Sequence, residues 1–213
     1  VLHRGTDPVG RLTAEAAGEL GLKVGLPVVA GAGDGSCASV GAGSAKSGDF
    51  YACLGTTAWI SYTADQPIFD RKKRLFNLTT TDGAAYGVFG TAQNAGQSVR
   101  WAMKLLGDSH ETAFDRAAAL VSPGSDGLLF LPYLDGERSP VYDADARGIY
   151  FGIGSRHQGA HFRRAVLEGV ALALRSIVAV FREQTAVNTM KLIGGGARSD
   201  LWRQIIAAAC AVE

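Results

Sequence analysis

Short apolar runs that end at or near a glycine alternate with longer amphipathic stretches along this chain. A short apolar run bounded by glycine is typical of a strand that enters a tight turn. Runs of this kind occupy residues 27–30, 49–54, 59–63, 85–89, 128–131 and 191–193. We predict a strand at each of them.

The strongest helical pattern covers residues 160–184, where apolar side chains recur at three- and four-residue steps. These side chains are Phe162, Val166, Val170, Ala173, Ile177 and Phe181. Shorter helices are predicted for residues 95–106 and from Ser199, which can cap a helix, to the end of the chain. Strands and helices interspersed in this way predict an α/β fold whose sheet is covered by helices.

The composition is that of an ordinary globular protein, since the 213 residues are 47% hydrophobic and 19% charged. This length predicts one large or two small domains. The 21 basic and 20 acidic residues nearly cancel. The balance argues against nucleic acid or an anionic membrane as a partner and favours a small molecule.

No apolar run has the length of a membrane span, and Cys37, Cys53 and Cys210 lack the spacing of a metal site. We therefore expect a cytoplasmic protein. The chain starts at Val1 in place of methionine, and its last predicted helix reaches Glu213 without a closing strand. Both ends are therefore expected to lie inside a longer protein.

The first candidate for chemistry is Asp34, which follows an apolar run and lies between Gly33 and Gly35. The glycines let the backbone turn sharply and leave room for a ligand. A carboxylate at the end of a strand can accept a proton from a substrate hydroxyl. Asp-Gly is also a common turn dipeptide, so an ordinary turn is the alternative interpretation.

The second candidate is Gly55-Thr56-Thr57, which joins two apolar runs and suits the turn of a β-hairpin. Its backbone N–H groups and its two hydroxyls are donors that can hold phosphates. An ordinary β-turn is again the alternative.

The third candidate is Gly194-Gly195-Gly196, which separates a strand from the helix that Ser199 is expected to cap. Successive glycines are favoured where a ligand approaches the main chain at a helix N-terminus. No Gly-Lys-Ser/Thr follows, which excludes a P-loop. Ser199 stands where the last glycine of GxGxxG would be, so a Rossmann oxidoreductase stays open as an alternative that NAD binding would test.

His157 and His161 have the four-residue spacing of two metal ligands on one helical face. No glutamate follows His157 as the zinc-protease motif requires, and no third ligand is nearby. We therefore predict no metal site on the protein, and we expect His161 to open the long helix.

In this order, these segments resemble the FGGY carbohydrate kinases. Residues 148–168 are similar throughout to the C-terminal signature of that family, and residues 132–140 and 164–169 are similar to its xylulokinase-type members. The resemblance extends from about residue 31 to Glu213.

The resemblance implies an actin-like ATPase, ribonuclease H-like fold of two domains, with ATP and sugar in the cleft between them. Residues 1–45 would end the N-terminal sugar-binding domain. Residues 46–213 would form the C-terminal ATP-binding domain, truncated at its C-terminus. The implied cofactors are ATP and Mg²⁺, with the metal held largely by ATP phosphates and water, and a homodimer is considered.

The resemblance also implies roles for single residues. Asp34 matches the catalytic base, which touches the sugar hydroxyl. Thr56, flanked by Gly55 and Thr57, matches the phosphate-contacting turn. Gly96 matches a glycine of the nucleotide cleft, and Arg100 falls where relatives place another nucleotide contact.

The glycine-rich turn before the last helix matches the family's adenosine-binding turn. The matching residues are Gly195 and Ser199, with Gly194 and Gly196 beside them. A reaction of this kind asks the protein mainly for positioning and charge stabilisation.

The implied activity is phosphorylation of a small sugar or polyol, with a ketopentose such as D-xylulose as the leading substrate. Ribulose, gluconate and glycerol stay open, because Gly35-Ser36 follows Asp34 where xylulokinases tend to carry Asn and small residues. A non-catalytic actin-like nucleotide-binding module is the alternative of another class, although a scaffold would have no use for Asp34. The family's N-terminal Asp-x-Gly-Thr/Ser motif is absent, so residues 1–213 alone are expected to be inactive.

Overall fold

The computed structural model describes residues 2–213. The elements follow in the order β1 (Pro8–Arg11), α1 (Ala14–Leu20), β2 (Pro27–Val29), α2 (Asp34–Gly41), β3 (Phe50–Leu54), β4 (Ala58–Ala64), β5 (Phe76–Thr79), β6 (Tyr86–Ala92), α3 (Gly96–Leu106), α4 (Glu111–Ala119), the 3₁₀ turn η1 (Ser125–Gly127), β7 (Leu129–Leu131), β8 (Ile149–Phe151), α5 (Gly159–Arg182), β9 (Lys191–Ile193), the 3₁₀ turn η2 (Gly195–Arg198) and α6 (Asp200–Cys210).

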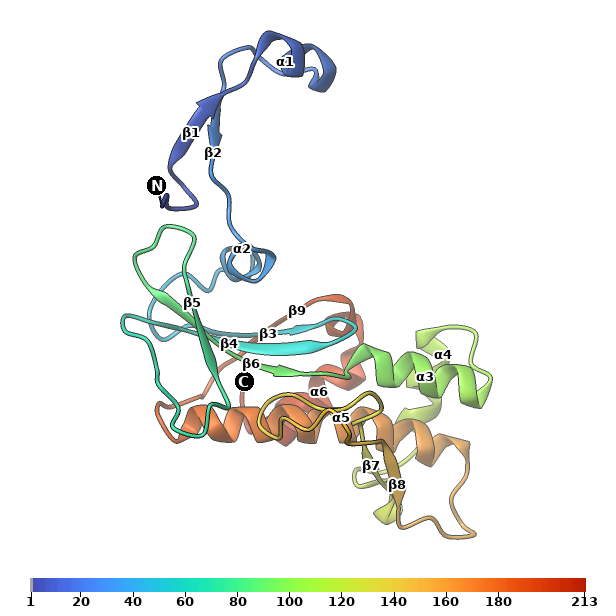
Figure 1. The fold of residues 1–213 in the computed structure, drawn as a ribbon. Coiled ribbons are helices and arrows are strands. Elements are labelled where there is room, and N and C mark those ends of the chain that lie inside the picture. The colour runs from blue at the N-terminus through green and yellow to red at the C-terminus, as the bar shows by residue number, and fades with distance from the viewer. Residues whose placement is uncertain (1) are drawn as a thin grey trace.

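A five-stranded sheet in the order β5-β6-β4-β3-β9 forms the centre of the molecule (Figure 1). Neighbouring strands are antiparallel except β9, which is parallel to β3. The predicted α/β class and the six predicted strands are confirmed. Strands β1, β5 and β8 were not predicted. In the edge strand β5, Phe76 and Leu78 are exposed.

One face of the sheet is covered by α5, which runs along it (Figure 1). The predicted apolar stripe is buried there, and Phe181 packs edge-on against Phe50 with ring centroids 5.4 Å apart. A Cβ at Gly90 of β6 would lie 2.4 Å from Cγ2 of Ile177. The glycine therefore allows helix and sheet to approach closely enough to share one core.

The other face is covered by α2 (Figure 1), and hydroxyl groups join this helix to the sheet. The Tyr51 hydroxyl on β3 lies 3.0 Å from Oγ of Ser39 and accepts a 3.0 Å hydrogen bond from Nε1 of Trp59. The helix begins at Asp34. The extended backbone of Gly33 precedes it, and a carboxylate is favoured in the first helical turn.

Residues 2–33 form an arm that projects from the sheet, with β1 and β2 paired as an antiparallel hairpin and α1 at its tip (Figure 1). The predicted strand at 27–30 is β2 of this hairpin. Every residue of both strands is exposed, including Val9, Val28 and Val29. The arm therefore adds nothing to the sheet's core.

The last helix begins as predicted but ends early. The Ser199 hydroxyl caps it by accepting a 3.0 Å hydrogen bond from the amide of Trp202. The prediction that it runs to Glu213 was wrong, because α6 ends at Cys210 and Ala211 is left-handed with a φ of 50°. The amide of Glu213 instead donates to the carbonyl of Asn188. Among residues 2–213, no helix is long and apolar enough to cross a membrane.

Replacing Gly169 by alanine tests the packing of α5 on β7. A Cβ there would lie 2.2 Å from the Phe130 carbonyl oxygen, so the helix must shift. We expect Gly169→Ala to lower the free energy of unfolding by about 1–3 kcal/mol in urea titrations. The matched control is Gly18→Ala in α1, where a Cβ meets nothing within 4 Å. Equal stability of the two variants would refute this packing.

The ion pair of Asp70 with Arg74 predicts a pH dependence of stability. Nη2 of Arg74 lies 2.7 Å from Oδ1 of Asp70, and hydrogen bonding to this guanidinium lowers the pKa of Asp70 to about 2. In the unfolded chain that pKa is about 3.9. The stabilisation is thus present above pH about 4 and is lost as the pH falls toward about 2. Asp70→Asn should be less stable than the wild type at neutral pH, and urea unfolding should show the difference shrinking over that interval. A pH-independent difference would contradict it.

Candidate functional site

The centre of the candidate site is the β3–β4 turn, residues 55–57. Leu54 pairs with Ala58 at the ends of the two strands, and the amide of Gly55 donates to the Thr57 carbonyl at 2.9 Å. This confirms the predicted hairpin. Among residues 2–213, the amides of Thr56 and Thr57 donate no hydrogen bond. The turn therefore presents two free N–H groups and the exposed Thr56 side chain.

The N-terminus of α3 is fixed directly onto this turn. The amides of Ala95 and Gln97 each donate to the Thr56 carbonyl at 3.0 Å, and the amide of Gly96 donates to the Gly55 carbonyl at 2.9 Å. A Cβ at Gly96 would lie 2.6 Å from that Gly55 oxygen. Only glycine permits this approach. Gly96 and Thr56, which are far apart in the sequence, are thus brought together by backbone contacts.

Arg100 reaches the same turn from the next turn of α3. Its Nη2 donates to Oγ1 of Thr56 at 3.0 Å and to Oε1 of Gln97 at 3.1 Å. The guanidinium is exposed, so it lies beside the two free amides with donors left for an anion. Gln97, which orients it, was not singled out from the sequence.

The β9–α6 turn, residues 194–199, meets the end of β3 from the other side. Cys53 pairs with Ile193 in parallel, and Gly194 then turns away with a φ of 91°. A Cβ at Gly194 would lie 2.6 Å from the Leu54 carbonyl oxygen. Position 194 therefore requires glycine both for its conformation and for its contact.

The rest of this turn is open at one glycine and packed at the other. A Cβ at Gly195 would meet nothing within 4 Å, whereas one at Gly196 would lie 2.7 Å from Cζ3 of Trp202. Ser199 caps α6. Burial raises the pKa of Asp115 on α4, and a hydrogen bond from Ser199 opposes that rise. Gly195 is thus the position where a ligand can approach the backbone.

Asp34 lies at the start of α2, away from these contacts. It is exposed, and its Oδ1 accepts a 2.8 Å hydrogen bond from the amide of Gly35. Among the described residues, no hydrogen bond joins it to either glycine turn. The structure therefore brings together the predicted residues of the two turns and α3, but does not bring Asp34 into contact with them.

Sequence reasoning assigned no role to Glu137, which is 5% exposed. Its Oε1 accepts hydrogen bonds from the amides of Gln93, at 2.6 Å, and Arg138, at 2.7 Å. Gln93 directly follows β6, in the link that leads to α3. A glutamate in a polar segment carries no sequence signal of burial, and the donor from Gln93 lies 44 positions away in the sequence.

His157 and His161, the two histidines with metal-ligand spacing, both lie close to Asp126. His161 lies 3.3 Å from Oδ2 of Asp126, and His157 lies the same distance from the Asp126 carbonyl. In residues 2–213, no group of three His, Cys, Asp or Glu side chains could hold a metal ion. His161 is part of the capping box of α5, as expected from its place at the helix start.

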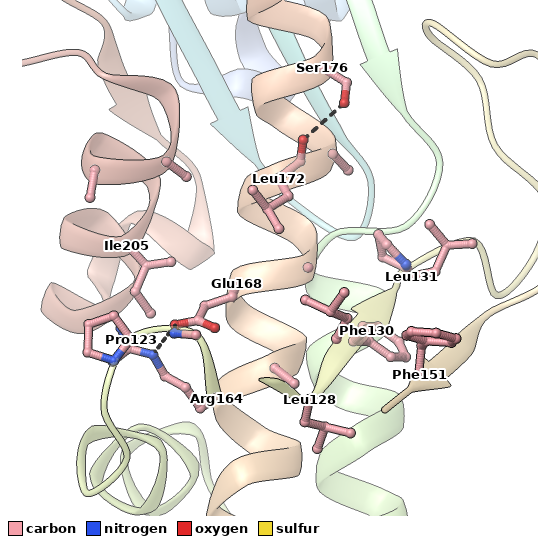
Figure 2. Close-up of a pocket in the computed structure, with 18 of the residues that line it drawn as sticks. Pro123, Leu128, Phe130, Leu131, Phe151, Arg164, Glu168, Leu172, Ser176 and Ile205 are labelled. Carbon is pink, nitrogen blue, oxygen red and sulfur yellow. Dashed lines mark hydrogen bonds and ion pairs between the residues drawn. The ribbon is translucent and has the colours of Figure 1, made fainter. Parts of the chain in front are cut away.

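A large groove of about 890 Å³ lies between α5, α6 and the β7–β8 hairpin (Figure 2). Its walls are mainly apolar, and its main charged pair joins Nε of Arg164 to Oε1 of Glu168 at 2.6 Å. None of the predicted site residues lines it. Its lining offers a phosphate little beyond Arg164, which is already paired, so the glycine turns are the better nucleotide site.

The mainly antiparallel sheet excludes the Rossmann alternative, which requires a mostly parallel sheet. The sequence matches the "FGGY family of carbohydrate kinases, C-terminal domain" over residues 50–213. It is 35% identical over 206 residues to the gluconokinase of Bacillus subtilis, covering 91% of this chain and 40% of that protein.

It is likewise 36% identical over 204 residues to the xylulose kinase of Staphylococcus epidermidis, covering 93% of this chain and 40% of the relative. The fold matches a crystal structure of ligand-bound xylulose kinase from Lactobacillus acidophilus with a TM-score of 0.90 and 30% identity, over 99% of this chain and 43% of that one. The chain thus spans less than half of these relatives and has the actin-like ATPase fold of the family. It belongs to the FGGY family of carbohydrate kinases.

Proposed function

We propose that this chain supplies the ATP-binding part of an enzyme that phosphorylates a small sugar or polyol. The observation that carries the proposal is the meeting of the β3–β4 turn, the N-terminus of α3 and the β9–α6 turn at one end of β3. Free amides in the β3–β4 turn, the exposed Arg100 guanidinium and an open glycine are suited to an anionic nucleotide.

In this proposal, separate groups of residues bind the phosphates and the adenosine of ATP. The amides of Thr56 and Thr57, the Thr56 hydroxyl and Arg100 would hold the phosphates. Gly195, with Gly194, Gly196 and Ser199 around it, would receive the adenosine. Mg²⁺ bound to the phosphates would neutralise charge on the transferred group.

Asp34 is proposed as the general base and as a contact to the sugar. One of its oxygens accepts the Gly35 amide, which leaves Oδ2 free to accept the proton of the attacking hydroxyl. Its exposure at a helix start leaves room for a substrate. Its distance from the glycine turns is consistent with a reaction in a cleft that closes on both substrates.

A ketopentose such as D-xylulose is the leading substrate, supported by the similarity to a xylulose kinase. Gluconate is the second candidate, because a gluconokinase is similar to the same degree. Ribulose and glycerol follow. We further propose that residues 1–45 end a sugar-binding domain and that residues 46–213 form the ATP-binding domain. The enzyme is proposed to be cytoplasmic, and a homodimer is the proposed assembly.

The first test is ADP release by the full-length protein containing this chain, with Mg-ATP and a panel of ketopentoses, aldonates and polyols. We expect one substrate to stimulate turnover and Asp34→Asn to lower kcat at least about 100-fold, because the base is lost. The matched control is Asp65→Asn, since Asp65 is another exposed aspartate far along the sequence.

Residues 1–213 alone are expected to show no sugar-dependent ADP release, because the other half of the cleft would be missing. Robust turnover by this piece would refute that part of the proposal. If the full-length protein binds nucleotide but no substrate stimulates turnover, the non-catalytic nucleotide-binding module replaces the kinase.

Replacing Gly96 by valine tests the nucleotide turn. Its side chain would collide with the Gly55 carbonyl and displace the two phosphate-binding amides. We expect Gly96→Val to raise the KM for ATP at least about tenfold in the same ADP-release assay. Gly18→Val, with open space around its Cβ, serves as the control. An unchanged KM for ATP would remove this turn from the site.

A further inference from the structure

The loop of residues 132–146 lies against the start of α3 through buried polar contacts. Besides the hydrogen bond from the Gln93 amide to Glu137, Nδ2 of Asn94 donates to the Gly136 carbonyl at 3.2 Å. Asn94 is 1% exposed. The loop is therefore bonded to residues 93 and 94, the link between β6 and α3.

This link is continuous with the nucleotide turn. Ala95, Gly96 and Gln97, which follow directly, make the three backbone hydrogen bonds to Gly55 and Thr56. A displacement of Gln93 would therefore be passed along four residues to the amides and the hydroxyl that face the phosphates. No other side chain among the described residues accepts the Gln93 amide.

We propose that Glu137 is a positioning residue for nucleotide binding, which holds the β6–α3 link so that α3 keeps the β3–β4 turn in its binding geometry. The inference rests on the proposed function of that turn. Glu137 touches neither Gly55 nor Thr56, so it acts through Gln93 and not by contact with the nucleotide.

The chemistry of the carboxylate supports this role. Both amides converge on Oε1, while Oε2 is buried without a hydrogen-bond partner. Burial raises the pKa of Glu137, and the amide hydrogen bonds act against that rise. A buried carboxylate is costly to retain for packing alone, since an apolar residue would fill the same space. We therefore ascribe the role of this carboxylate to Oε1, which accepts the hydrogen bonds from both amides.

The test is the Kd of Mg-ADP for the full-length protein, measured by calorimetry without sugar, beside the KM for ATP and for the sugar. Glu137→Ala should weaken Mg-ADP binding at least about tenfold, and so should Glu137→Asp, whose shorter side chain cannot reach both amides. Glu137→Gln keeps an acceptor oxygen and should stay within about threefold of the wild type. The KM for the sugar should not change.

Ser139→Ala is the matched control, because it loosens the same loop elsewhere. Oγ of Ser139 donates to the Arg74 carbonyl at 2.7 Å, away from the nucleotide turn. Its melting temperature should fall while its affinity for Mg-ADP stays unchanged. If Glu137→Ala does not fold, the Asp and Gln variants carry the comparison.

Wild-type affinity in Glu137→Asp, or an equal loss in Ser139→Ala, would overturn the inference while leaving the proposed function intact. A wild-type protein that binds no Mg-ADP would overturn both. Failure to find an acceptor sugar would count against the kinase activity alone, because the Mg-ADP measurement does not depend on turnover.

Discussion

The end of strand β3 is the point on which the site depends. Its last residue, Leu54, pairs with β4. Gly194 lies so close to the Leu54 carbonyl that a Cβ at position 194 would collide with it. Gly55, the next residue, accepts a hydrogen bond from the Gly96 amide at the start of α3, and a Cβ at Gly96 would likewise collide with the Gly55 carbonyl. Two close backbone approaches, each requiring glycine, therefore fix three segments around one strand end.

The two faces of the sheet serve this arrangement differently. On one face, α5 buries a continuous apolar stripe against the strands. On the other face, α2 is held by hydroxyl groups of Ser39 and Tyr51. A hydrophobic contact is nondirectional, whereas a hydrogen bond sets a defined orientation. The helix that carries Asp34 is thus oriented more by directional polar contacts than by packing.

The local apolar pattern was sufficient to predict the central strands and α5, because these elements are largely buried. It missed β5, whose apolar side chains are exposed at the sheet edge. It also predicted a C-terminal end of the last helix that lies beyond Cys210, because Ala211 has a high helix propensity. The glycine turns were predicted as candidates, but their position at the same end of β3 was not. That position depends on the parallel pairing of β3 with β9, and the burial of Glu137 depends on a hydrogen bond from the distant Gln93 amide. Neither is encoded in local pattern, and the place of Asp34 in a closed cleft stays a prediction.

The pairing of β3 with β9 also has a kinetic meaning. It joins a strand from the first third of the chain to one near its end, and such pairing closes a long loop and forms slowly. The β3–β4 hairpin is local and can form early, but it gains its second glycine turn only when this distant strand arrives. A nucleotide that bridges both turns would favour the completed topology by mass action. Its binding would then report that folding has reached its last strand.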